Sequence, residues 1–172
     1  MINFFKVFKW QLLYLILLCS VGPLSFKWGP VPLSFQTLFI LISPFIFNRK
    51  EAIVLILTYL FLGAIGLPVF AGYTGGMERL YGPTSGFLWG FIPVVYILTT
   101  FKDPKSFSRI FILLIFGHLI LFIPGFVILK FQKPEIELFN LFIRFVPGII
   151  IKSGLGSMTI RGYNKIIPNN ST

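Results

Sequence analysis

Long uncharged stretches, separated by short charged segments, are the feature that most constrains how this chain can fold. A helix needs about 20 predominantly apolar residues to cross the hydrocarbon core of a bilayer. Only 12% of the residues are charged, whereas soluble domains carry about a quarter. The sequence therefore predicts an integral membrane protein. Five uncharged stretches and a sixth that contains two cations occupy residues 10–26, 28–48, 52–77, 80–101, 110–129 and 138–160.

Proline and glycine residues shorten these stretches, because both tend to end helices. Ser34, which follows a proline-rich segment, is the expected N-cap of the second helix. We predict an all-α, polytopic membrane protein with six transmembrane helices, forming one domain over residues 1–172 with a polar, disordered tail at residues 164–172. The predicted spans are residues 10–22, 34–47, 52–67, 86–101, 109–129 and 138–160.

The basic residues predict the orientation of the helices in the cell membrane. The net charge of +10 would suggest nucleic acid for a soluble chain, but these cations fall mostly in loops, and we expect no nucleic-acid partner. With a cytoplasmic N-terminus, nine cations lie inside and four outside, which favours two cytoplasmic termini over the inverted topology. The inner cations are Lys6, Lys9, Arg49, Lys50, Lys102, Lys105, Arg109, Arg161 and Lys165, and the outer ones are Lys27, Arg79, Lys130 and Lys133.

Side chains suited to catalysis are scarce. The five acidic residues lie in or beside loops, and no carboxylate pair falls within a predicted span. His118 has no acidic residue three or four positions away, so we expect it to hydrogen-bond a neighbouring helix rather than to act as a base. Cys19 is the single cysteine and cannot form an internal disulfide. We predict no catalytic residue, no metal site and no cofactor.

Two cations inside the last predicted span are candidate binding residues. An ionisable side chain within a transmembrane helix is costly and marks a functional site by default. Lys152 follows Arg144 by eight residues, an offset of about 80° around a helix, so both side chains can face one cavity. No intramembrane carboxylate is available to either, which leaves backbone carbonyls, water or an anionic ligand as a partner. The alternative is that each side chain extends to the nearest membrane surface.

Glycine-rich segments give a second group of candidates. Irregular backbone at membrane depth is tolerated only where it is buried in protein or lines a cavity. The segments at residues 63–76 and 82–86 are of this kind, and Gly82, Gly86 and Gly90 also form a small-residue ridge on which a helix can pack closely. Gln36 adds a polar group near the outer end of the second helix. The alternative for Gln36 is a hydrogen bond to a neighbouring helix.

Four motifs resemble the BioY family, the biotin-specific substrate-binding (S) components of energy-coupling-factor (ECF) vitamin transporters. Residues 31–38 read VPLSFQTL and are similar to V-P-[IL]-[ST]-x-Q-T-L; residues 62–72 read LGAIGLPVFAG and are similar to L-G-A-x-G-L-P-V-F-A-G. Residues 82–87 read GPTSGF, as in G-P-T-[GS]-G-[YF], and residues 147–152 read PGIIIK, close to P-G-D-x-x-K. Three of these motifs in this order are highly specific.

The resemblance implies a six-helix S-component fold with a vitamin site near its outer side. It implies as partners biotin or a related carboxylated vitamin, the lipid bilayer, a transmembrane coupling protein and ATP-binding cassette ATPase subunits. In this interpretation Lys152 or Arg144 attracts the ligand carboxylate, while the glycine-rich loop holds the ring system. The residues expected at the site are Lys152, Arg144, Tyr73, Thr74, Gly75, Gly76, Gly82, Thr84, Gln36 and Ile149.

Ile149 is a departure from the family pattern, because it stands where the pattern has an acidic residue. The predicted site thus has fewer hydrogen-bond acceptors beside Lys152. Two other functions therefore stay open: an S-component for another carboxylated cofactor such as lipoate, and a membrane scaffold without a ligand. An intramembrane enzyme that uses His118 is the weakest alternative.

Overall fold

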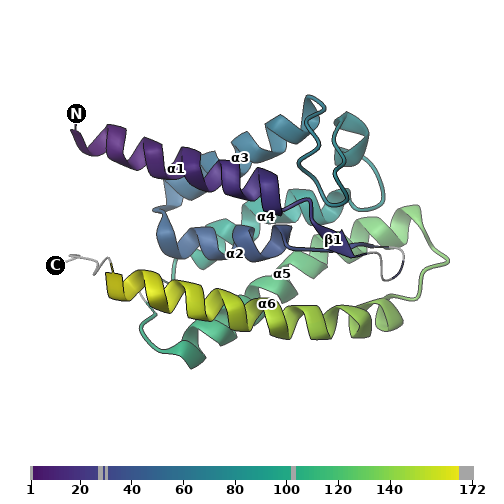
Figure 1. Ribbon diagram of the computed structural model, residues 1–172. Coiled ribbons are helices and arrows are strands. Elements are labelled where there is room, and N and C mark those ends of the chain that lie inside the picture. Colours follow the sequence, from purple (N-terminus) through teal and green to yellow (C-terminus); the bar gives the residue numbers. More distant parts are fainter. Residues whose placement is uncertain (1, 27–28, 30, 102–103, 167–172) are drawn as a thin grey trace.

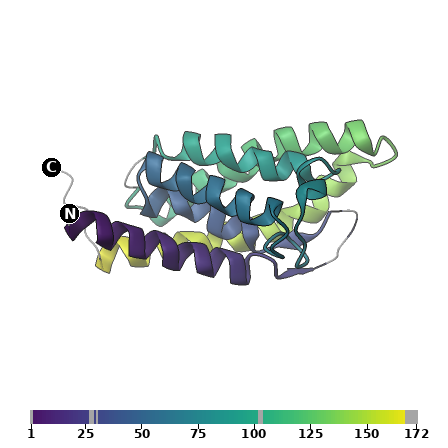
Figure 2. The ribbon, with the colours of Figure 1, turned by 90° about the horizontal axis from the view of Figure 1, so that it is seen from above.

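The computed structural model describes residues 2–26, 29, 31–101 and 104–166, and six α-helices form this part of the chain. The all-α prediction is confirmed. The first turn of α1 and the last turn of α6 lie at the same end of the bundle (Figure 1, Figure 2). The α-helices are α1 (Ile2–Val21), α2 (Gln36–Ile46), α3 (Arg49–Ala64), α4 (Ser85–Leu98), α5 (Phe107–Gln132) and α6 (Leu138–Ile166); the short elements are β1 (Ser25–Phe26), β2 (Leu33–Ser34) and the 3-10 helix η1 (Met77–Leu80).

Helix α2 is central because it contacts all five of the other α-helices. It is short, at 11 residues, and the consecutive residues Ile40, Leu41 and Ile42 are all buried because other helices surround it. Helices α4 and α5 form the closest pair, and α6 packs along α5. A Cβ atom at Gly86 would lie 2.1 Å from the carbonyl oxygen of Pro124, so the small residues of α4 allow α5 to approach as their spacing predicts.

The helix bounds differ from the predicted spans at several points. Within the described residues, α5 and α6 are long and apolar enough to cross a membrane, whereas the apolar helices α2 and α4 are shorter. Helix α6 continues to Ile166, so the predicted polar tail is helical at its start, and residues 167–172 lie outside the described residues. No proline stands between residues 160 and 166 to end the helix, and the basic residue Lys165 suits its last turn.

The sequence predicted Ser34 as the N-cap of α2, and this prediction is wrong. Ser34 lies in β2, where it pairs with Ser25 of β1, and Phe35 takes the cap position without a side-chain hydrogen bond. Pairing with β1 holds Ser34 in extended backbone, one residue before the position that caps α2. A true cap occurs at α3, where the Asn48 side chain accepts from the Glu51 amide and Glu51 accepts from the Asn48 amide, both at 3.0 Å.

The loop after α3 folds back onto the helix that precedes it. The Phe70 ring occupies the space that a side chain at Gly63 would fill, since a Cβ atom there would lie 2.0 Å from it. Tyr59 donates its hydroxyl to the Val69 carbonyl at 2.6 Å and meets the Phe70 ring edge-on. The Gly72 amide donates to the Pro23 carbonyl at 2.8 Å, which ties this loop to the end of α1.

Candidate ligand-binding site

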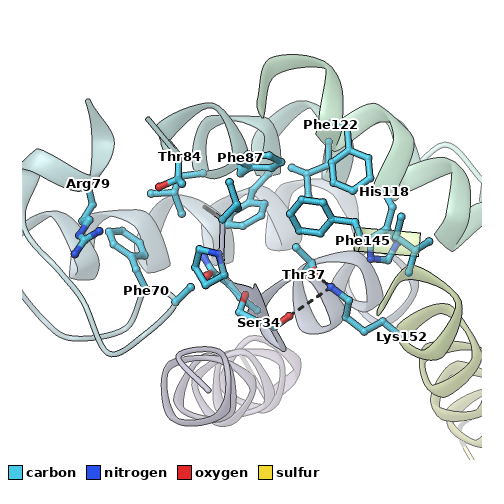
Figure 3. Close-up of a pocket in the computed structure, with 18 of the residues that line it drawn as sticks. Ser34, Thr37, Phe70, Arg79, Thr84, Phe87, His118, Phe122, Phe145 and Lys152 are labelled. Carbon is cyan, nitrogen blue, oxygen red and sulfur yellow. Dashed lines mark hydrogen bonds between the residues drawn. The ribbon is translucent and has the colours of Figure 1, made fainter. Parts of the chain in front are cut away.

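A cavity of about 170 Å³ lies between the start of α2, the loop after α3, and helices α4, α5 and α6 (Figure 3). It is near the end of the bundle that carries β1 and the loop after α3, away from the first turn of α1 and the last turn of α6 (Figure 1). Arg79 and Lys152 stand at opposite ends of the cavity (Figure 3). The lining residues are Val31, Pro32, Ser34, Gln36, Thr37, Phe70, Ala71, Thr74, Arg79, Thr84, Phe87, Leu88, Phe91, His118, Leu121, Phe122, Phe145, Ile149 and Lys152.

Lys152 forms the polar end of the cavity. Its ammonium donates to the Thr37 hydroxyl at 2.6 Å and more distantly to the Ser34 carbonyl at 3.4 Å (Figure 3). Only 9% of Lys152 is exposed, so the side chain turns inward rather than to a membrane surface. The alternative that Lys152 extends to the bilayer edge is therefore wrong.

The charge of Lys152 has no carboxylate beside it. The cavity lining contains no Asp or Glu, and the ion pair found in the described residues joins Lys133 and Glu135 on the surface. Ile149 lies one helical turn before Lys152 and contributes only an apolar side chain. A buried ammonium with two neutral acceptors leaves a third donor free, and an acceptor on a ligand would lower the cost of burying the charge.

Aromatic rings form the apolar wall. Phe87 of α4 meets Phe122 of α5 edge-on, with ring centroids 6.1 Å apart. Phe122 and Phe145 of α6 lie closer, at 5.1 Å, so three helices contribute to one aromatic cluster. Such a wall suits a compact ring system or a hydrocarbon chain, because ligand pockets combine mostly apolar surface with a few placed polar groups.

Half of the residues predicted for the site line the cavity. These are Lys152, Ile149, Gln36, Thr74 and Thr84. Gln36 is 3% exposed, and its amide nitrogen has no hydrogen-bond partner in the described part of the chain. This nitrogen therefore does not make the hydrogen bond to a neighbouring helix that was the alternative interpretation of Gln36.

The other predicted residues are placed elsewhere. Arg144 is exposed, with its side chain against the backbone of Gly29, because the cavity-facing positions of this stretch are Phe145 and Ile149. Tyr73 is 59% exposed, has a positive φ of 56° and does not line the cavity. Gly75, Gly76 and Gly82 shape the loops without lining the cavity.

His118, Arg79 and the aromatic cluster are site residues that the sequence analysis did not assign. His118 was expected to bond a neighbouring helix, but its Nδ1 contacts the Leu114 carbonyl of its own helix at 2.8 Å. A single histidine among apolar residues was the signal in the sequence that His118 could be a site residue. The spacing of residues does not show which group its ring contacts. Arg79 was counted only as a loop cation.

A solved structure has this arrangement of helices and defines the class of the fold. It is the S-component for biotin from an ECF-type ABC transporter, which matches with a TM-score of 0.84 and 24% identity, covering 95% of this chain and 93% of that chain. The fold is therefore that of an ECF S-component. The BioY family model matches residues 7–169, and the chain belongs to the BioY family.

Two curated relatives support this membership. The biotin transporter BioY of Thermotoga maritima is 35% identical over 115 residues, which is 66% of this chain and 68% of the relative. The biotin transporter BioY2 of Lactococcus lactis subsp. cremoris is 36% identical over 117 residues, which is 67% of this chain and 64% of the relative. The resemblance stated from the motifs is confirmed, and with it the assignment as a membrane protein.

Proposed function

We propose that this chain is the substrate-binding membrane subunit of an ECF-type vitamin transporter and that it binds biotin. The observation that carries the proposal is the cavity itself, which joins an aromatic wall to a buried, unpaired ammonium at Lys152. The names of the relatives and of the solved S-component, all given for biotin, support the choice of ligand.

The chemistry of the cavity matches a small molecule with an apolar ring system and polar ends. Lys152 donates a charge-assisted hydrogen bond to an acceptor of the ligand. This acceptor takes the place of the carboxylate that the cavity lining lacks. The rings of Phe87, Phe122 and Phe145 pack against the apolar part. Binding and release of such a ligand need no covalent step, so we propose a binding subunit rather than an enzyme.

Inward delivery requires partners. The sequence contains no G-x-x-x-x-G-K-[ST] motif for nucleotide phosphates, so ATP hydrolysis is assigned to ATPase subunits that act through a transmembrane coupling protein. Small residues let helices approach closely, but residues 12–20 of α1 are mostly bulky and apolar.

Binding of biotin by the purified chain is the direct test. We expect biotin to copurify in small-molecule mass spectrometry, and titration to give one saturable site. Binding of lipoate in place of biotin would favour the other S-component function. Binding of neither compound by a monodisperse, helical protein would favour a scaffold and overturn the proposal.

We also propose that the chain crosses the membrane several times with both termini in the cytoplasm. On a Cys19→Ser background, Glu78→Cys in η1 should react with an impermeant thiol reagent added outside intact cells, and Lys105→Cys should react only after permeabilisation. The opposite pattern would establish the inverted topology. Lys27 and Lys102, which the sequence analysis placed in these loops, lie outside the described residues.

A further inference from the structure

His118 carries a buried hydrogen-bonding atom that the protein does not use. The residue is 2% exposed in the middle of α5 and lines the cavity at the end where Lys152 lies (Figure 3). Its Nδ1 is 2.8 Å from the Leu114 carbonyl oxygen. A carbonyl oxygen can only accept, so the proton of the neutral imidazole is on Nδ1, and Nε2 carries a lone pair.

Nε2 of His118 has no partner among the described residues. A second proton on the ring would place another buried positive charge beside Lys152, with no carboxylate in the cavity lining to offset it. Nε2 is therefore an acceptor. Buried acceptors in native proteins are nearly always satisfied, so an orphan acceptor on a residue that lines the cavity points to a ligand that donates to it.

Two other groups of the cavity lining have unused donors, whereas the Thr37 hydroxyl and the Ser34 carbonyl already accept from Lys152. Lys152 has a free N–H, and the Gln36 amide nitrogen is unpartnered. Ile149 adds no acceptor. One free acceptor and two free donors in the same cavity lining suit a cyclic urea or cyclic amide, in which N–H groups flank a carbonyl. A carboxylate only accepts and would face the lone pair of His118.

We propose that His118 is a specificity-determining residue whose Nε2 accepts an N–H from the cyclic urea of the ligand. The assignment rests on the proposed function, since biotin carries such a ring. It orients the ligand: the ring lies at the Lys152 end, and the carboxylate points towards Arg79, which is exposed at the other end of the cavity (Figure 3). A carboxylate there keeps part of its hydration and gains a cation.

The experiment compares two substitutions that differ in the acceptor. His118→Leu removes it, and His118→Gln keeps a side-chain oxygen at about the position of Nε2. For the full-length protein in detergent, we expect His118→Leu to weaken biotin binding by about tenfold or more and His118→Gln to lose clearly less. Lipoate has no ring N–H, so whatever affinity it has should be equal in the wild type and in His118→Leu.

Equal losses of biotin affinity in the Leu and Gln variants would show that His118 only packs, and would overturn the assignment. Unchanged affinity in His118→Leu, or a matching loss for lipoate, would do the same. If leucine prevents folding, His118→Met makes the same comparison with a flexible apolar side chain. A wild-type protein that binds no biotin would contradict the proposed function itself, whereas biotin binding that ignores His118 contradicts only this inference.

Discussion

Replacing Gly75 by valine should abolish biotin binding, lowering affinity by at least roughly 100-fold. A Cβ atom at this position would lie 2.3 Å from the Leu67 carbonyl oxygen and 2.8 Å from the Gly66 carbonyl carbon, both of which are backbone atoms. The loop after α3 would have to open. Thr74, which precedes Gly75, lines the cavity, and its carbonyl accepts from the Phe70 amide at 2.8 Å. Opening the loop would therefore move this wall of the cavity.

Gly154→Val is the matched control. Apart from its chain neighbours and the nearby backbone of α6 itself, no atom lies within 4 Å of a Cβ atom at Gly154. The same change at this position should therefore leave binding intact. Titration calorimetry and thermal unfolding of both variants make the measurement. Biotin binding by Gly75→Val at wild-type affinity would show that the loop after α3 is not part of the site.

Lys152→Ala should weaken biotin binding by about 1.5–3 kcal/mol, or roughly 10- to 150-fold. The variant loses the charge-assisted hydrogen bond to the ligand and leaves the Thr37 hydroxyl without its donor. Removing a buried charge that has no carboxylate partner also removes a cost, so the folded protein itself should not be destabilised in proportion. Equilibrium binding together with thermal unfolding separates the two effects.

Lys152→Met tests the interpretation, because methionine keeps an apolar stem of similar length without the ammonium. It should bind biotin as weakly as Lys152→Ala. Lys165→Ala, which removes a cation from the last turn of α6, should bind as the wild type does. Wild-type affinity in Lys152→Met would mean that the ammonium forms hydrogen bonds within the protein but does not contribute to ligand binding.

Much of the helix pattern could be predicted from the sequence because membranes impose a strong rule. Uncharged stretches of sufficient length have to be helical when no water is available to the backbone. Local exceptions were harder to see. Ser34 has a side chain suited to capping, yet the pairing of β1 with β2 places it in a strand, and such pairing depends on a contact that a local pattern does not encode.

The site was predicted in part, for reasons that individual residues make clear. Lys152 and Gln36 are polar residues in apolar surroundings, which is a local signal, and both line the cavity. Arg144 gives the same signal but is exposed, because an offset of about 80° allows two side chains to share a face without requiring it. Thr37 accepts from Lys152 across 115 positions of the chain, a distance that no single sequence reveals.

The hydrogen bond from the Gly72 amide to the Pro23 carbonyl makes one cover out of two loops. The segment after α1 leads through β1 to Val31, Pro32 and Ser34, and the loop after α3 carries Phe70 and Thr74; both groups line the cavity. The bond joins the two segments on one side of the cavity, so a displacement of one segment is coupled to the other for as long as the bond is intact.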